Sequence, residues 1–201
     1  MAKKLKIGIT GGIGSGKSVV TGFLKESGYP VIKSDEIAKE LMLKDEKVKK
    51  KLVAAFGVEV FENNVLNTKY LAEKIFNSKE NVVKINSIVH PAVIKKNDEL
   101  AKQLFNEYRI VFVESALIYE AKIQDKFDFI ILVYSDETDR IKRTVLREKT
   151  TVEEIKKRMA FQIPDEKKKN LAHFVIENNS TIDDLKSRTL FILNLLKSIT
   201  I

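Results

Sequence analysis

The chain of 201 residues contains no cysteine, only two histidines and no long apolar run. Without cysteine the protein can form neither a disulfide nor a cysteine-ligated zinc site, and thiol catalysis is excluded. The histidines, His90 and His173, have no second histidine or cysteine at metal-ligand spacing, so no zinc site is predicted. No segment approaches the length of a transmembrane helix, and we expect a cytoplasmic protein that does not bind a membrane.

The chain is strongly basic: it has 36 lysines and arginines and 28 acidic residues, which gives a net charge of +8. A positive surface attracts phosphate-rich ligands or nucleic acid, but lysines also solvate helix faces. The lysine runs at 47–51 and 167–169 lie on segments with helical spacing, which favours solvated faces. No basic stretch is interleaved with aromatic residues that could stack on bases, so we expect no nucleic-acid partner. The sequence carries no signal for an oligomeric state.

Residues 11–18 read Gly-Gly-Ile-Gly-Ser-Gly-Lys-Ser and fit the phosphate-loop pattern G-x-x-x-x-G-K-[ST] without a mismatch. A short apolar strand is expected before the loop and a helix after it, which makes a chance match by a glycine-rich turn the weaker interpretation. The four glycines can adopt positive φ and let backbone N–H groups approach an anion beside a helix amino end. Lys17 would reach the β- and γ-phosphates and the Ser18 hydroxyl would bind Mg²⁺. The residues expected to hold the nucleotide are Gly12, Ile13, Gly14, Ser15, Gly16, Lys17, Ser18 and Val19.

Apolar runs that alternate with helical patterns predict an α/β fold with a parallel sheet covered on both faces. Five strands are expected, at 5–10, 31–33, 109–114, 127–134 and 174–177. Residues from about 44 to 107 have apolar positions at helical spacing with no convincing strand, which indicates a helical insertion between two strands. We expect one domain over 1–201 with its core in 1–43 and 108–201. Further helices are expected at 37–42, 137–147, 151–162 and 182–198.

Two acidic residues follow strands, at the sheet edge where α/β proteins bind their ligands. Asp35 follows the second strand and could accept a proton from a hydroxyl that attacks a γ-phosphate, or it could merely cap the next helix. Glu114 ends the third strand and could hold Mg²⁺ through water, orient the acceptor, or be a solvated acid.

Arginines are concentrated between residues 140 and 158. Arg143 and Arg147 are four residues apart and share a helix face, while Arg158 lies on the next helix. Positioned arginines stabilise the charge of a transferring phosphoryl group, and two short helices joined by a loop are typical of a lid. A solvated basic helix is the alternative. We expect the lid over about 147–163.

Taken in order, these segments resemble the dephospho-coenzyme A kinases, which use ATP to phosphorylate the ribose 3′-hydroxyl of dephospho-coenzyme A. The stretch 116–120, Ala-Leu-Ile-Tyr-Glu, is similar to the family's Pro-Leu-Leu-Phe-Glu element, and 143–147 is similar to its Arg-x-x-x-Arg helix. Lys33, Ala116 and His173 stand where the family usually has aspartate, proline and aspartate. The other segments that carry the resemblance are 9–18, 31–35, His90-Pro91, 158–162 and 174–179.

The resemblance implies a three-layer P-loop NTPase fold with a five-stranded parallel sheet, a helical acceptor-binding insertion and a short lid. It implies ATP as phosphoryl donor, Mg²⁺, and dephospho-coenzyme A as acceptor. Asp35, Lys17 and Arg147 would be catalytic, with Asp35 deprotonating the 3′-hydroxyl and Arg147 steadying the γ-phosphoryl group. Arg143, Arg147 and Arg158 would contact ATP, and Asp35, His90, Glu114 and Leu117 would contact the acceptor.

A nucleotide or nucleoside kinase is the close alternative to this assignment. A GTPase-like switch is another, but the chain has no Asn-Lys-x-Asp segment for guanine recognition.

Overall fold

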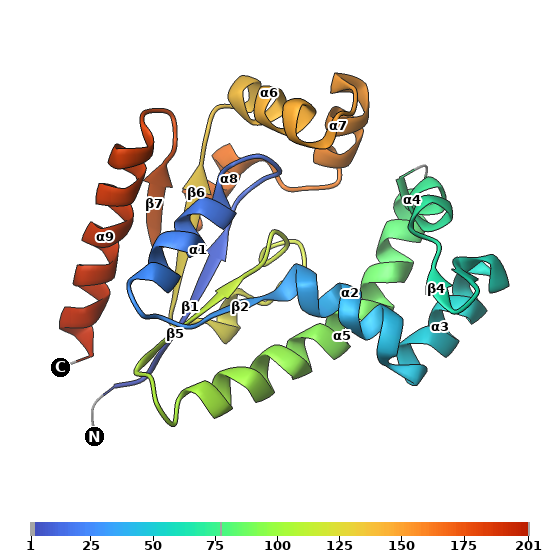
Figure 1. Cartoon of the computed structure of the whole chain (residues 1–201), viewed down its shortest axis with the longest axis horizontal. Coiled ribbons are helices and arrows are strands. Elements are labelled where there is room, and N and C mark those ends of the chain that lie inside the picture. Colours follow the sequence, from blue (N-terminus) through green and yellow to red (C-terminus); the bar gives the residue numbers. More distant parts are fainter. Residues whose placement is uncertain (1–2, 77, 201) are drawn as a thin grey trace. The chain divides into compact units, whose positions relative to one another are not determined.

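The computed structural model describes residues 3–76 and 78–200, in which one five-stranded parallel sheet has the strand order β2-β5-β1-β6-β7 (Figure 1). The predicted α/β fold and parallel sheet are confirmed, and the strands β5 and β6 begin one and two residues later than expected. Their near-continuous apolar sequences are typical of strands covered on both faces. The strands are β1 (Leu5–Thr10), β2 (Val31–Lys33), β5 (Ile110–Glu114), β6 (Phe129–Tyr134) and β7 (Phe174–Glu177).

The side chains of the central strands alternate between two covered faces. On one face Ile7, Ile9 and Ile131 pack with side chains of α1 (Lys17–Glu26) and α9 (Ile182–Ile199). On the other face Ile130 packs with Ile118 and Tyr119 from the segment after β5. The sheet is thus the middle layer of three.

Three further helices follow β6: α6 (Glu137–Glu148), α7 (Val152–Met159) and α8 (Asp165–Lys169). The predicted helix to Gln162 ends at Met159, and α8 was not predicted. Thr151 caps α7, because its hydroxyl accepts a hydrogen bond from Glu154 N.

The chain divides into two compact units. The unit that carries the sheet runs to Lys33 and resumes at Leu100, and the second unit is Ser34–Glu99. The second unit begins and ends earlier in the chain than the insertion predicted at about 44–107. It includes the whole of α2 (Ser34–Lys44). The other elements of this region are α3 (Glu46–Phe56), η1 (Val58–Val60), β3 (Phe61–Glu62), β4 (Val65–Leu66), α4 (Thr68–Phe76) and α5 (Lys79–Leu104).

The second unit has its own core, which includes Leu52, Phe56, Val60 and Leu71. Its β3 and β4 pair as an antiparallel hairpin, so the prediction that no strand interrupts the helical insertion is wrong. Asn63 and Asn64 form the turn with φ angles of 49° and 63°, which asparagine tolerates better than most residues. Two-residue strands are too short to show an alternating apolar pattern, and the sequence therefore gave no strand signal here.

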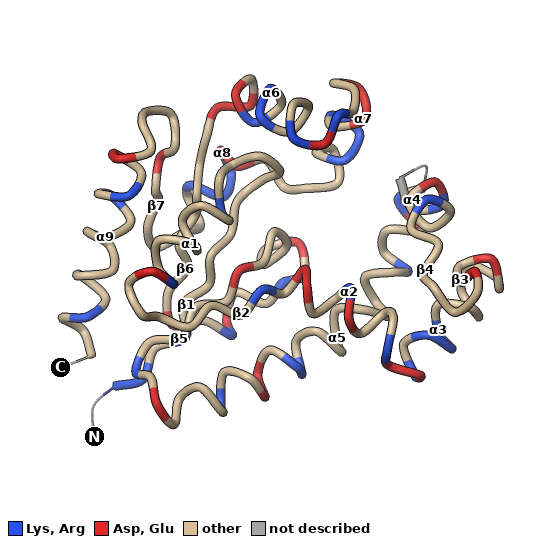
Figure 2. Tube along the Cα trace, in the orientation of Figure 1, with Lys and Arg blue, Asp and Glu red and all other residues tan. Residues whose placement is uncertain are grey.

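Lysines and arginines are spread over helices of both units among acidic residues (Figure 2).

No helix in the described part of the chain is both long and apolar enough to cross a membrane. A short helix η2 (Gln124–Lys126) precedes β6 and completes the elements of the sheet unit.

Candidate active site

The predicted phosphate loop joins the carboxyl end of β1 to α1. Gly16 is the N-cap residue of α1 with a φ of 99°, a left-handed conformation that glycine adopts without strain. Of the four glycines of the loop, Gly11, Gly14 and Gly16 have positive φ and Gly12 does not. Glycine is required at position 12 because there is no room for a side chain: a Cβ there would lie 1.9 Å from Arg140 Nη1 and 2.7 Å from Asp165 Oδ2.

Lys17 and Ser18 lie in the first turn of α1. Lys17 Nζ donates hydrogen bonds to the carbonyl oxygens of Gly11 (2.8 Å) and Gly12 (3.2 Å). The Ser18 side chain is exposed. A lysine ammonium on the loop, a helix amino end and an exposed hydroxyl fit a phosphate group with an associated Mg²⁺ ion.

Glu114 lies beside α1. It is the register partner of Ile9 in the neighbouring strand β1, at the carboxyl end of the sheet. Thr21 Oγ1 on α1 is 3.3 Å from Glu114 Oε2 and 3.1 Å from the Ser18 carbonyl oxygen. The structure therefore brings Glu114 close to the turn that carries Ser18. Among the described residues, no group of three or more His, Asp or Glu side chains is placed to hold a metal.

Arg143 is linked to the phosphate loop through Asn178. Its Nη2 donates to the Asn178 carbonyl oxygen (3.0 Å), and Asn178 Nδ2 donates to the Ser15 carbonyl oxygen (2.8 Å). Arg143 Nη1 also donates to Ser135 Oγ after β6 (3.2 Å). The exposed Arg143 thus lies where the ends of β6 and β7 meet the loop.

Arg147 and Arg158 meet at one carboxylate. The Nη2 atom of Arg147 is 2.6 Å from Glu148 Oε1, and Arg158 Nη1 is 2.5 Å from Glu148 Oε2. Burial opposes ionisation of Glu148, but the hydrogen bonds and charges of the two arginines outweigh it and hold the pKa of Glu148 below its ordinary value. Glu148 therefore joins α6 to α7 in the segment predicted to form the lid.

The segment after β5 carries Leu117, which is half-buried and whose N–H donates to Ser115 Oγ (3.3 Å). The next residues turn into the core, where burial raises the pKa of the Tyr119 hydroxyl to about 12. Glu120 lies in the same turn, and its Oε1 accepts from Ile163 N (2.9 Å). This segment therefore contacts the residues between α7 and α8.

The catalytic candidate Asp35 and the acceptor candidate His90 lie in the second unit. The chain passes from β2 directly into α2, and Asp35 is an exposed residue of the first helical turn rather than a residue before it. His90 is half-buried on α5, followed by Pro91 within the helix.

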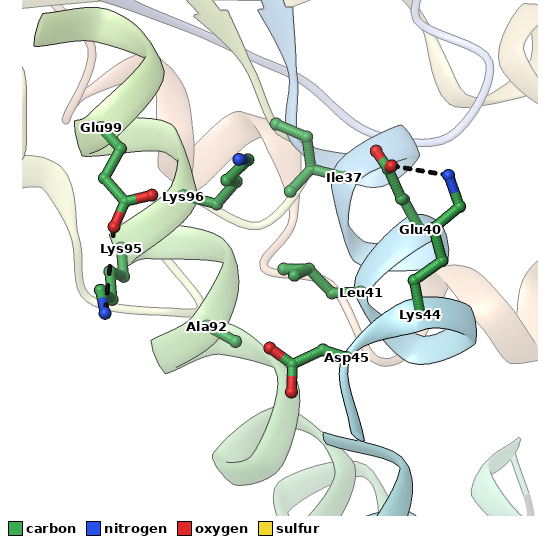
Figure 3. Close-up of a pocket in the computed structure, with 9 residues that line it drawn as sticks. All are labelled: Ile37, Glu40, Leu41, Lys44, Asp45, Ala92, Lys95, Lys96 and Glu99. Atoms are coloured by element: carbon green, nitrogen blue, oxygen red, sulfur yellow. Dashed lines mark hydrogen bonds and ion pairs between the residues drawn. The ribbon is translucent and has the colours of Figure 1, made fainter. Parts of the chain in front are cut away.

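The second unit also has a pocket of about 390 Å³ between α2 and α5 (Figure 3). Lys44 pairs with Glu40 and Lys95 with Glu99 at its rim. Acidic and basic side chains are equally numerous in its wall, which gives it no preference for an anion. The lining residues are Ile37, Glu40, Leu41, Lys44, Asp45, Ala92, Lys95, Lys96 and Glu99.

Sequence patterns assign no site role to four residues near the loop: Glu120, Gln162, Asp165 and Lys168. Asp165 Oδ2 accepts from Gly12 N (2.9 Å), and Gln162 Oε1 accepts from Ile13 N (3.1 Å). Lys168 was interpreted as part of a solvated lysine run, and this is wrong, because its side chain is 0% exposed. Lys167 is exposed, Lys168 is buried and Lys169 is half-buried, and because this order follows from the position of each residue on the helix, it carries no separate sequence signal.

Comparison with known proteins gives one consistent result. The family model described as Dephospho-CoA kinase matches residues 5–184. A dephospho-CoA kinase of Salinibacter ruber is 36% identical over 185 residues, which cover 91% of this chain and 93% of the relative. The crystal structure of a Thermus thermophilus protein is similar with a TM-score of 0.83 and 31% identity, covering 96% of this chain and 98% of that one. A dephospho-CoA kinase from Campylobacter jejuni is similar with a TM-score of 0.71 and 25% identity, covering 95% and 96%.

Proposed function

The chain belongs to the dephospho-CoA kinase family, and we propose that it transfers the γ-phosphoryl group of ATP to the ribose 3′-hydroxyl of dephospho-coenzyme A. The products are coenzyme A and ADP, in the last step of coenzyme A biosynthesis. The observation that carries the donor half of this proposal is the phosphate loop at the end of β1, with Lys17 on the loop and Arg143 linked to it through Asn178.

On the donor side, the loop residues hold the phosphates of ATP through backbone N–H groups and the amino end of α1. The Lys17 ammonium pairs with the β- and γ-phosphates from its place beside the carbonyl oxygens of Gly11 and Gly12. Arg147 and Arg158 exchange the carboxylate of Glu148 for the γ-phosphoryl oxygens, whose charge grows in the transition state. Arg143 contacts the nucleotide from the edge of the lid.

Mg²⁺, bound with the nucleotide, would neutralise charge on the β- and γ-phosphoryl oxygens. Ser18 is the residue that would hold it, since its hydroxyl is exposed in the first turn of α1. Glu114 lies beside the same turn and would contact the ion through water or orient the acceptor.

On the acceptor side, the oxygen of the 3′-hydroxyl forms the new bond to the γ-phosphorus, and Asp35 accepts the proton of that hydroxyl. The bond from that phosphorus to the β,γ-bridging oxygen breaks, and the electron pair leaves with ADP. An exposed carboxylate two residues beyond the carboxyl end of β2 suits this role. The insertion with His90, together with Leu117, binds dephospho-coenzyme A, and the segment from about 147 to 163 acts as the lid.

The proposal is tested with purified protein, ATP, Mg²⁺ and a panel of acceptors. Dephospho-coenzyme A is expected to give coenzyme A and ADP in equal amounts. Nucleoside monophosphates, nucleosides and water serve as the other acceptors, and GTP replaces ATP in a parallel series. Turnover of a nucleoside monophosphate without turnover of dephospho-coenzyme A would contradict the proposal, and so would a strict preference for GTP. The cytoplasmic location expected from the sequence stays a prediction.

A further inference from the structure

Four charged side chains form a buried cluster behind the phosphate loop. Arg140 Nη1 is 3.1 Å from Asp165 Oδ2, and Lys168 Nζ is 3.6 Å from Asp165 Oδ1 and 2.9 Å from Glu120 Oε1. The exposed fractions of the four side chains are 8% for Arg140, 2% for Asp165, 0% for Lys168 and 10% for Glu120. Lys168 therefore lies between two carboxylates, out of contact with solvent.

Each of the two carboxylates of the cluster accepts a hydrogen bond from a backbone N–H group of a different segment. Asp165 Oδ2 accepts from Gly12 N in the phosphate loop, at 2.9 Å. Glu120 Oε1 accepts from Ile163 N, at 2.9 Å, and Glu120 itself lies in the turn that carries Leu117. Through Lys168, the cluster joins the phosphate loop to the turn after β5 and to the end of the predicted lid.

The peptide group that joins Gly11 to Gly12 also connects the cluster to the proposed chemistry. Its N–H group, on Gly12, donates to Asp165 Oδ2 (2.9 Å), and its carbonyl oxygen, on Gly11, accepts from Lys17 Nζ (2.8 Å). The position of this peptide therefore contributes to where the Lys17 ammonium lies. A change in the cluster that moves this peptide would shift an acceptor of Lys17 without altering the turn of α1 that contains the lysine.

Stability alone does not account for this cluster. Taking charges out of water is expensive, and the attraction between them offsets the cost only when their remaining polar atoms are paired. Within the described residues, Glu120 Oε2, Asp165 Oδ1 and Arg140 Nε are buried and accept or donate no hydrogen bond. Replacing a buried ion pair by apolar side chains of similar size is often neutral or stabilising in proteins.

We propose that Lys168 is a positioning residue for phosphoryl transfer, which acts through Asp165 and Glu120 and touches neither substrate. It holds the Gly11–Gly12 peptide, and thereby Lys17, in register with the turn that carries Leu117. The inference rests on the proposed kinase function. A displacement of about 1 Å in an active site can cost about 100-fold in rate, so a small shift of this peptide has a large effect.

Lys168→Met removes the ammonium and keeps most of the side-chain volume. We expect kcat for coenzyme A formation to fall by about 10- to 100-fold. The KM for ATP should change much less, because most of the loop and the amino end of α1 stay in place. Lys167→Met is the matched control: it makes the same charge change on the same helix at an exposed position, and its kcat should equal that of the wild type.

The double variant Lys168→Met/Glu120→Gln separates positioning from folding stability. It removes the ion pair as a whole, and the glutamine oxygen still accepts from Ile163 N. We expect the melting temperature to return toward the wild-type value while kcat stays low. If kcat instead recovers together with the melting temperature, or if folded Lys168→Met has wild-type kcat, the positioning role is wrong.

Glu120→Gln alone decides the matter if Lys168→Met does not fold, since it changes almost no volume. A several-fold loss of kcat is expected, and an unchanged kcat in this folded variant would overturn the proposal. The failure of the proposed function is recognised separately, because the wild-type protein would then not form coenzyme A from dephospho-coenzyme A at all.

Discussion

Asn97 Nδ2 donates a hydrogen bond of 2.9 Å to Ser34 Oγ, and each of these two residues is only 4% exposed. Asn97 lies on α5, and Ser34 is the first residue of α2, directly before Asp35. The bond fixes the start of α2 against α5 inside the second unit. The orientation of the proposed base Asp35 therefore depends on a hydrogen bond between two residues that are 63 positions apart in the sequence.

Ser34→Ala should lower the free energy of unfolding by about 1–3 kcal/mol, because the buried Asn97 amide loses its acceptor. Ser34→Ala/Asn97→Leu should be closer to the wild type, since both polar partners are removed together. Urea unfolding of the three proteins measures this. A double variant that is less stable than the single one would show that Asn97 has another essential contact.

Asp35→Asn should reduce kcat by about 10²- to 10⁴-fold, the range expected when a general base is removed. The melting temperature and the affinity for ATP should stay near the wild-type values, because Asp35 is exposed and the ATP loop lies elsewhere in the chain. Steady-state kinetics, thermal unfolding and an ATP titration give the three quantities. Glu36→Gln, at the neighbouring exposed acid, is the control and should retain activity. Near-normal turnover of Asp35→Asn would remove the base from the mechanism.

The contact of Glu148 with Arg147 and Arg158 predicts a pH dependence of stability. The pKa of Glu148 in the folded protein is lowered from an ordinary value near 4.5. The stabilisation is therefore fully present above that ordinary value and is lost as the pH falls through the lowered pKa.

Melting temperatures of the wild type and of Glu148→Gln should differ most at neutral pH and converge in acid. The same comparison with Glu137→Gln, an exposed acid at the start of α6, should show no comparable convergence. A difference between wild type and Glu148→Gln that is constant from neutral to acidic pH would contradict the assignment of the contact.

Gly12→Ala should destabilise the protein by about 1–3 kcal/mol, because the new Cβ overlaps the Arg140–Asp165 pair and the neighbours must move. It should also lower kcat, since Gly12 holds Lys17 through its carbonyl oxygen. Gly22→Ala is the matched control within α1: no atom lies within 4 Å of the added Cβ, and about 0.5–1 kcal/mol of stabilisation is expected. Thermal unfolding of both variants checks the contrast. Equal effects at the two positions would show that close packing around Gly12 is not the reason for its glycine.

Several features could be predicted because they depend on residues close together in the sequence. The phosphate loop is a continuous run of eight residues between an apolar strand and a helix, and its backbone conformation follows from its glycines. The buried strands are recognisable in the sequence as apolar runs. The start of α7 is marked by a local hydrogen bond between Glu154 and Thr151. In each case the interactions that produce the local structure involve only residues within or next to the sequence pattern that predicts it.

The tertiary structure decided what joins distant segments. Gly12 and Asp165 are 153 residues apart, and only folding shows that one holds the other or that Gly12 is required for space rather than for positive φ. Lys168 resembles its neighbours Lys167 and Lys169 in residue type and in its place on a short helix, and it is the buried one of the three because the packing of α8 turns it toward Glu120. The sequence by itself determined the phosphate loop and the parallel sheet, whereas burial and ion pairing, which depend on the whole fold, decided which charges support the loop.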